Sequence, residues 1–342
     1  MDPASSRNWK LLEARSLPAG RGRLISVSNQ KGGVAKTTTS VNLAAALALR
    51  GHRALVVDID PQANATTGLG VDRSVVPGST YDLLVRGAPV EELIAPTKIE
   101  GLFCVPSSQD LAGAEVELVS VMERERRLRD AVEPCRDRFD FIFLDCPPSL
   151  GLLTINALVA AQDLIVPVQC EYYALEGLGQ LLGNAERVRR ALNPGLRIAG
   201  FLMTMYDART KLSSQVADEV RRNFKDLVYA TVIPRSVRLS EAPSFGEPVL
   251  TLDPSSRGSI AYRLLAAEVE ARYGLQQMRS PVPPPPPPIP EMPSVPMTVK
   301  KAEPGPSGRG FGSVSVPPVD LDQAWPRQPW AAALAGDIEA ER

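Results

Sequence analysis

The amino-acid sequence predicts a doubly wound α/β fold, in which helices flank both faces of a mainly parallel β-sheet. Short runs rich in Val, Ile and Leu alternate with longer segments of helical periodicity. Continuous apolar runs are typical of strands buried on both faces of a parallel sheet. A chain of 342 residues that is 44% hydrophobic can bury a core of that size. The predicted strands are residues 23–29, 53–58, 102–106, 139–145, 163–169, 197–203 and 230–234.

Charge and hydropathy narrow the class of protein. The formal net charge is -1, so a surface that binds nucleic acid would have to be a local basic patch. No stretch approaches the roughly 18 apolar residues that a membrane helix needs, and the first residues contain no hydrophobic signal core. We therefore expect a cytoplasmic protein without a membrane span.

The cysteines and the single histidine do not form a metal motif. No two cysteines are spaced as C-x-x-C, and a zinc site would therefore lack ligands at suitable spacing. We expect reduced, mostly buried thiols, as in a cytosolic protein. His52 follows Gly51 and is expected in a surface loop. The cysteines are Cys104, Cys135, Cys146 and Cys170.

Composition divides the chain into three segments. Residues 1–22 lack periodicity and are predicted to be a flexible, mildly basic arm. Residues 23–275 form the predicted folded domain. Residues 276–342 contain 16 of the 32 prolines, a composition that favours extended polyproline II, so we expect a disordered tail. The tryptophans lie only in the two flanking segments, where they are either anchors for a partner or incidental residues: Trp9, Trp325 and Trp330.

A glycine-rich turn follows the first predicted strand, in the sequence NQKGGVAKTTTSVNLAAALALRG. A strand, a glycine-rich turn and a helix N-terminus together form an anion cradle, because backbone N–H groups and the helix dipole both attract phosphate. Lys36 would contact the β- and γ-phosphates of a nucleotide, and the Thr37 hydroxyl would ligate Mg²⁺. The ordinary G-x-x-x-x-G-K-[ST] pattern fails at Gln30 and Ala35, which replace its glycines.

The segment KGGVAKTTTS resembles the deviant Walker A loop of the ParA/Soj/MinD ATPases, which is usually KGGVGKTT. The resemblance implies that Lys31 reaches across a two-fold interface to the partner's nucleotide, which links dimerisation to nucleotide state. We expect Ala35 to be tolerated only if φ is not positive there. A weakened or inactive ATPase is the alternative. The implied ATP-binding residues are Lys31, Gly32, Gly33, Val34, Ala35, Lys36, Thr37 and Thr38.

Three aspartates follow predicted strands. Asp58 and Asp60 would point the same way if their strand continued through both. In the resembling family this segment is switch I, so Asp60 is implied to position the attacking water and Asp58 to support the metal or the switch. Asp145 ends the run 139–145 and is interpreted as the Walker B carboxylate that holds Mg²⁺ through water. The residues after it, 147–149, resemble switch II.

The resemblance to chromosomal ParA/Soj proteins extends over roughly residues 23–273. It rests on VQCEYYALEGL, LMTMYDARTKLSSQV and VIPRSVRLSEAPSFGEPVLTLDPSSRGSIAY. It implies that Arg209 and Arg238 bind DNA and that Pro234 lies near the adenine. Contact with phosphates alone predicts binding that is independent of DNA sequence and weakened by salt. Plausible neighbours in the DNA contact are Lys211, Arg235 and Arg257.

The resemblance therefore implies a partitioning ATPase that segregates chromosomes or plasmids. Such a protein forms an ATP-dependent homodimer on the nucleoid, binds double-stranded DNA without sequence preference, and hydrolyses ATP slowly until a ParB-type adaptor stimulates it. The proline-rich tail could recruit a further partner. The mixed-charge run 123–129 is more simply an exposed helix face with local ion pairs.

Three other functions remain open from the sequence. A MinD-like membrane ATPase would need a basic amphipathic C-terminal helix, whereas this chain ends in AAALAGDIEAER. An electron-transferring iron protein would need paired cysteines from two subunits, and Cys146 in LDCPPS matches Soj instead. A nucleotide-gated scaffold, in which Ala35 has made hydrolysis vestigial, is the third.

Overall fold

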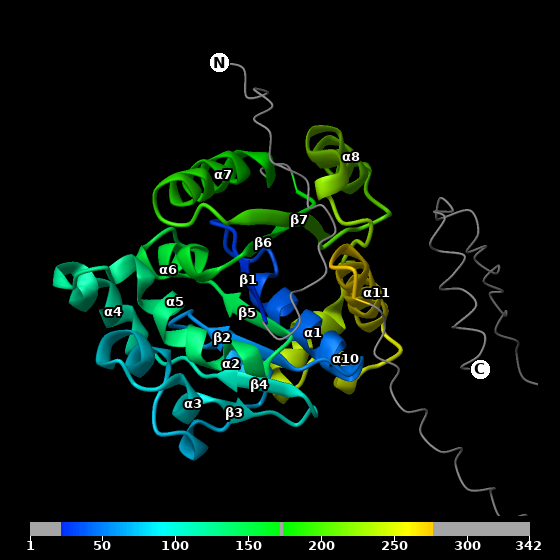
Figure 1. Cartoon of the computed structure of the whole chain (residues 1–342). Coiled ribbons are helices and arrows are strands. Elements are labelled where there is room, and N and C mark those ends of the chain that lie inside the picture. Colours follow the sequence, from blue (N-terminus) through cyan, green and yellow to red (C-terminus); the bar gives the residue numbers. More distant parts are fainter. Residues whose placement is uncertain (1–21, 172–173, 276–342) are drawn as a thin grey trace, which may run out of the picture. The chain divides into compact units, whose positions relative to one another are not determined.

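The computed structural model describes residues 22–171 and 174–275, which form a seven-stranded sheet between two layers of helices (Figure 1). The strand order is β3-β4-β2-β5-β1-β6-β7, and every neighbouring pair is parallel except β3 with β4. This confirms the predicted fold class. The strands are β1 Arg23–Val27, β2 Ala54–Asp58, β3 Ala95–Pro96, β4 Leu102–Val105, β5 Phe141–Asp145, β6 Asp163–Gln169 and β7 Arg197–Thr204.

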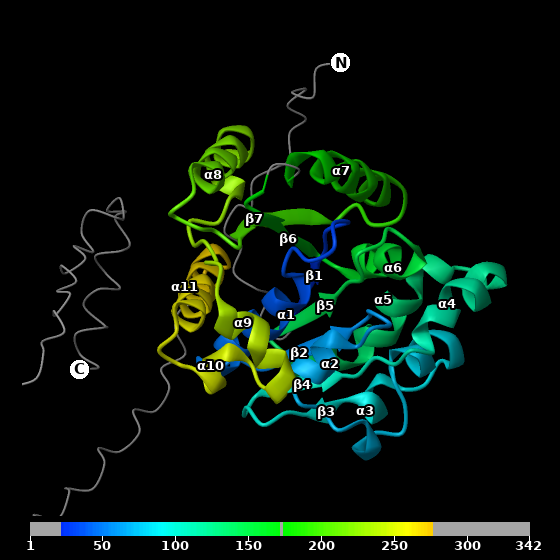
Figure 2. The same ribbon diagram turned by 180° about the vertical axis from the view of Figure 1, so that it is seen from behind.

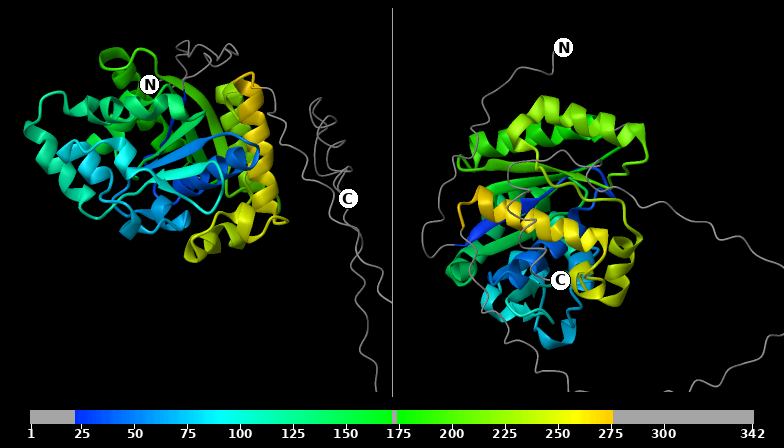
Figure 3. Two further views of the ribbon diagram at one scale, coloured as in Figure 1. Left: turned by 60° about the horizontal axis from the view of Figure 1, so that its bottom comes forward. Right: turned by 90° about the vertical axis from the view of Figure 1, so that its right-hand side faces the viewer.

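The helices bury apolar side chains against both faces of the sheet. One core contains residues of α3 Val90–Leu93, α4 Leu111–Glu117, α5 Arg127–Val132, α6 Leu152–Ala160, α7 Ala174–Ala191 and α8 Lys211–Phe224. The other contains residues of α1 Lys36–Leu49, α2 Asn64–Gly68, α9 Val237–Glu241, α10 Val249–Leu252 and α11 Arg257–Arg272. Helices α9, α10 and α11 lie together on one flank (Figure 2), and α11 packs on α1 (Figure 3).

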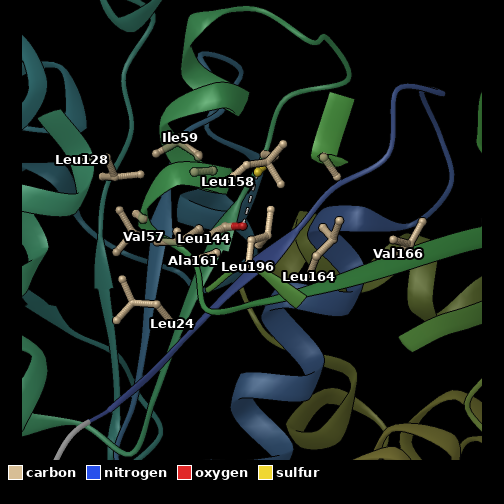
Figure 4. Packing of buried hydrophobic residues seen from close by; sticks show 14 of the residues in the cluster. Leu24, Val57, Ile59, Leu128, Leu144, Leu158, Ala161, Leu164, Val166 and Leu196 are labelled. Carbon is tan, nitrogen blue, oxygen red and sulfur yellow. Dashed lines mark hydrogen bonds between the residues drawn. The ribbon is translucent and has the colours of Figure 1, made fainter. Parts of the chain in front are cut away.

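Strand alternation assigns neighbouring residues to opposite cores. Leu24, Leu144 and Leu164 come from three adjacent strands and lie in the first core, where Leu158 of α6 joins them (Figure 4). Ile25, the residue after Leu24, lies in the second core. Successive side chains of a strand point to opposite faces, and helices cover both faces of this sheet. Nearly all residues of these strands are therefore buried, and the runs are mostly apolar rather than alternating.

One strand prediction is wrong. The run 230–234 lies beside β7, and Tyr229 N and Ile233 N donate to Phe201 O and Met203 O at 2.9 and 2.8 Å. The pairing is limited to isolated bridges, one of which joins Tyr206 to Pro234. Proline cannot donate a ladder hydrogen bond, so the segment does not develop into a full edge strand.

The prediction for His52 is also wrong. Its side chain is buried, with Nε2 2.8 Å from Glu270 Oε1 and Nδ1 3.7 Å from Asp140 Oδ2. The two carboxylates offset the cost of burial and raise the pKa of His52 to about 9, although burial by itself lowers that pKa. All four cysteines are buried and free, as predicted.

The mixed-charge run 123–129 was predicted in part. Ion pairs join Arg124 to Glu125 and Arg126 to Glu123 in a 3₁₀ turn rather than in a long helix. Arg127 instead points inward and donates to the carbonyl oxygen of Leu84 at 2.9 Å.

The predicted N-terminal arm and proline-rich tail, with the three tryptophans, lie outside the described residues. Within the described ranges, no helix is both long and apolar enough to span a membrane.

Candidate functional site

The candidate site lies where β1, β2 and β5 end. The parallel registers align Val27 with Asp145 and Asp145 with Asp58, so the chain leaves these three neighbouring strands at one edge of the sheet. Ligands of open parallel sheets bind at this carboxyl edge. The structure thus brings together the glycine-rich turn and the aspartates that the sequence analysis selected.

Lys36 is the first residue of α1 and lies deep in the turn. It is 6% exposed, and its Nζ donates to the Lys31 carbonyl oxygen at 3.2 Å. Burial lowers the pKa of Lys36, while the nearby carboxylates of Asp145 and Asp60 raise it. The ammonium group therefore bonds one carbonyl oxygen of the turn and lies near two carboxylates outside it.

Two side-chain hydrogen bonds anchor the turn to the sheet, and a third closes the turn on itself. Asn29 Nδ2 donates to the Pro167 carbonyl oxygen at 2.7 Å, and Asn29 Oδ1 accepts from Lys31 N at 3.0 Å. Thr204 Oγ1, at the end of β7, donates to the Val34 carbonyl oxygen at 3.1 Å. The turn is therefore held by β6 and β7 as well as by β1.

The middle of the turn is open. A Cβ atom built on Gly32 or Gly33 would meet no atom within 4 Å, and Gly33 has a φ of +72°. An L side chain at Gly33 would be strained, and one at Gly32 would fill the space above the turn. This open cradle fits a phosphate group.

Ala35 does not satisfy the expectation that φ is not positive. Its φ is 68° and ψ is 36°, in the left-handed region, immediately before the first residue of α1. The cost for a residue with a Cβ is roughly 1–2 kcal/mol. The surrounding hydrogen bonds impose this conformation, including that from Thr39 N to the Ala35 carbonyl oxygen at 3.0 Å.

Of the two carboxylate oxygens of Asp145, one accepts a hydrogen bond and the other has no hydrogen-bond partner. Ser40 Oγ lies 2.7 Å from Asp145 Oδ1 and donates to it, whereas the buried Oδ2 has no hydrogen-bond partner. Burial, and secondarily the charge of Asp58, raises the pKa of Asp145, and the hydroxyl groups of Ser40 and Thr37 oppose this shift. An unsatisfied buried carboxylate oxygen beside a threonine hydroxyl fits a hydrated Mg²⁺ ion.

Sequence reasoning missed Ser40. It lies one helical turn after Lys36, which places both residues on the same face of α1. The sequence carried only a weak signal for it, because Ser40 ends the polar run 37–40 at the start of the helix.

Asp58 makes hydrogen bonds to the segment that follows β2. Its Oδ2 accepts from Thr66 N at 2.8 Å and from Thr66 Oγ1 at 2.7 Å, and its Oδ1 accepts from Asp60 N at 3.2 Å. Both oxygens are therefore occupied, and the side chain is fully buried. Burial raises its pKa. Of the two roles considered for Asp58, the geometry favours holding α2.

Asp60 follows the end of β2, so the strand does not continue through both aspartates. Its Oδ1 accepts from Gln62 N at 3.0 Å, and its side chain is 5% exposed. Residues 60–63 form a turn that starts α2, and Ala63 has a positive φ of 56°. The carboxylate lies close enough to Lys36 to affect its pKa.

Lys31 is held within its own chain. Its Nζ lies 3.4 Å from Glu171 Oε2, and the side chains of Lys31 and Glu171 are 35% and 50% exposed.

Cys146, next to Asp145, is fully buried, and its Sγ lies 3.3 Å from Ser26 Oγ. A metal cluster shared between subunits could not reach this thiol, which argues against the iron-protein alternative.

The remaining predicted contacts lie farther along the edge. Pro234 pairs with Tyr206, two residues after β7 ends. Arg209 has an 88% exposed side chain and pairs with Asp207 at 2.8 Å. Arg238 is 57% exposed and pairs with Glu241 at 3.1 Å and with Asp253 at 3.3 Å. Both arginines are accessible but already carry acidic partners.

Comparison with known proteins identifies the family. A family model described as an AAA domain matches residues 22–198. The sporulation initiation inhibitor protein Soj of Bacillus subtilis is 56% identical over 250 residues, which cover 73% of this chain and 99% of that protein. The chromosome partitioning protein ParA of Myxococcus xanthus is 51% identical over 73% of this chain and 89% of its own length. The chain belongs to the ParA/Soj family of chromosome-partitioning ATPases.

Solved structures agree with this assignment to the ParA/Soj family. The cell division ATPase MinD of Pyrococcus furiosus superposes with a TM-score of 0.62 at 29% identity, covering 73% of this chain and 99% of MinD. A protein described as cobyrinic acid a,c-diamide synthase of Mycobacterium smegmatis, crystallised with ADP and magnesium, gives 0.64 at 39% identity. It covers 75% of this chain and 98% of its own length.

Proposed function

We propose that this ParA/Soj protein binds ATP and Mg²⁺ at the carboxyl edge of its sheet and hydrolyses ATP slowly, as a nucleotide-driven partitioning ATPase. The observation that carries the proposal is the free, buried Oδ2 of Asp145 below an open glycine turn that begins at Lys31 and ends at Lys36. A buried acceptor and a buried ammonium group beside an open cradle match the charges of a metal-bound phosphate.

Each residue has a defined task in this proposal. The amide groups of residues 32–38 and the Lys36 ammonium bind the phosphates, while Thr37 and Asp145 hold the metal, the latter through water. Asp60 orients the attacking water, and Asp58 fixes the switch that carries Asp60. Mg²⁺, when bound, would neutralise charge on the phosphates and so favour attack at the terminal one. Pro234 would border the base.

We further infer that two copies of the chain close around the nucleotide. Lys31 reaches the partner's phosphates only after it leaves Glu171, from which its Nζ is 3.4 Å away. An exposed ion pair contributes only about 0–1 kcal/mol, so nucleotide binding can readily break it. Hydrolysis stimulated by a ParB-type adaptor would then return the pair to single chains.

The closed dimer is proposed to bind double-stranded DNA through Arg209 and Arg238. Both guanidinium groups are exposed, and phosphate would replace the present acidic partners. Contacts limited to phosphate predict binding without sequence preference. Such a protein would act in the cytoplasm on the nucleoid, without a membrane surface. Its cargo would be a chromosome or a plasmid.

The direct test measures binding to unrelated DNA duplexes with ATP, ADP or no nucleotide across a salt series. We expect binding only with ATP, and in Arg238→Glu we expect a loss of affinity and a smaller salt slope. Arg222→Glu, on the exposed helix α8, is the matched control because its arginine also pairs with an acidic residue. Binding that is equal in all nucleotide states would contradict the proposal.

A scaffold with vestigial hydrolysis is the second candidate, and the positive φ of Ala35 favours it. Phosphate release separates the two functions. ATP-dependent dimerisation without measurable turnover, together with recovery of turnover in Ala35→Gly, would establish the scaffold.

A further inference from the structure

A hollow of about 510 Å³ lies at the amino edge of the sheet, opposite to the edge that carries the candidate nucleotide site. Its lining comes from the starts of β1 and β7, from the connections α6–β6 and α7–β7, and from α5 with the turn that follows it (Figure 1). Residues that are far apart in the sequence therefore meet here. None of them belongs to the site described above.

The hollow gathers positive charge from four separate segments. Glu133 is the single acidic residue among the residues that line it, and Asp130 and Asp163 are further acidic partners of the arginines. Four arginines against these three carboxylates leave a net charge of +1. The arginines are Arg23, Arg129, Arg136 and Arg197.

Two arginines at the base of the hollow share one buried carboxylate, and both of its oxygens also lack a hydrogen-bond partner. Arg23 Nη1 is 3.4 Å and Arg197 Nη2 is 3.2 Å from the same buried carboxylate, that of Asp163. Arg23 is 5% exposed, and its Nε has no hydrogen-bond partner. A buried donor without an acceptor is unfavourable.

The arginines are not needed to cap the helix that ends here. Asn193 Nδ2 donates to the carbonyl oxygens of Leu158 and Ala161 at 2.9 and 2.6 Å, which satisfies the C-terminus of α6. The side chains of Arg129 and Arg197 are 39% and 30% exposed, so they can bind a further partner.

We propose that this hollow binds an oxyanion, a carboxylate or a phosphate, held by Arg129, Arg136 and Arg197 above the buried Arg23. The planar guanidinium group matches both kinds of oxyanion with paired hydrogen bonds. The apolar residues 159–161 line the same hollow and can contact the methylene groups of an acidic side chain.

The test measures two probes on the full-length chain: a fluorescein-labelled hexaglutamate peptide, by anisotropy, and inorganic phosphate, by its ability to displace the peptide. We expect Arg129→Ala and Arg197→Lys each to weaken peptide binding about tenfold or more. Arg197→Lys keeps a charge beside Asp163 but loses the planar fork, so folding is preserved. The doubly substituted Arg221→Ala, Arg222→Ala chain, altered on the exposed face of α8, should bind as the wild type does.

Lys36→Ala separates this site from the nucleotide site. Peptide affinity should be unchanged in Lys36→Ala, even if nucleotide binding is lost. Displacement by phosphate would identify a free oxyanion as the ligand, and binding of the peptide alone would identify a carboxylate segment of a protein. The proposal is overturned if both hollow variants bind the peptide as tightly as the wild type does, or if Lys36→Ala loses peptide binding. It is also overturned if the wild type does not bind the peptide at physiological ionic strength, or if duplex DNA displaces the peptide in a way that depends on the same arginines.

Discussion

At the scale of single residues, the phosphate turn contains a conformation that its sequence does not favour. Ala35 has a φ of 68°, which glycine adopts without steric cost. Ala35→Gly removes this cost but increases the entropy of the unfolded chain, so the free energy of unfolding should rise by at most about 1 kcal/mol. Denaturant titration measures the change. A clear loss of stability would show that the methyl group contributes packing that outweighs its strain.

The bond between Ser40 and Asp145 leads to a second prediction at this scale. Ser40→Ala leaves the buried Asp145 Oδ1 without its 2.7 Å donor, so we expect a loss of about 1–3 kcal/mol in stability. The carboxylate also loses its fixed orientation, and the Mg²⁺ concentration needed to tighten ADP binding should rise. Ser40→Thr, which keeps the hydroxyl group, should restore both values. A loss of stability with no change in Mg²⁺ dependence would limit Ser40 to a structural role.

At the scale of elements, His52 joins α11 to the start of the central strands. Its imidazole contacts Glu270 of α11 and Asp140, which precedes β5. The pKa of His52 is raised from 6.5 to about 9 in the folded state, so folding favours the protonated form. This contribution, up to about 3 kcal/mol, is fully present below pH 6.5 and is lost as the pH rises through 9.

His52→Gln tests the link between these elements. We expect the stability of the wild type to fall between pH 6.5 and 9, and that of the variant to be lower but to change less over this range. Urea unfolding at several pH values provides the measurement. Parallel curves for the two proteins would show that another group causes the pH dependence.

At the scale of the whole molecule, the function depends on the proposed assembly of two copies. Lys31→Ala should retain nucleotide binding, because Lys36 remains in the turn, but should abolish dimerisation with ATP. Light scattering after size exclusion measures the mass in each nucleotide state. Glu171→Gln, which releases Lys31 from its partner at 3.4 Å, should instead favour the dimer. An ATP-dependent Lys31→Ala dimer would contradict the proposed role of this lysine.

The sequence by itself determined the fold class and, apart from Ser40, the residues described at the candidate site. Buried parallel strands need apolar runs, and a phosphate turn needs glycines and lysine at fixed spacing. Both features can therefore be recognised from short segments of the sequence. Only the tertiary structure decided the conformation of Ala35, the pairing of Asp58 with Thr66, the burial of His52 and the convergence of four arginines at the opposite edge. These features depend on contacts between segments distant in the chain, where packing and long-range hydrogen bonds outweigh local preference.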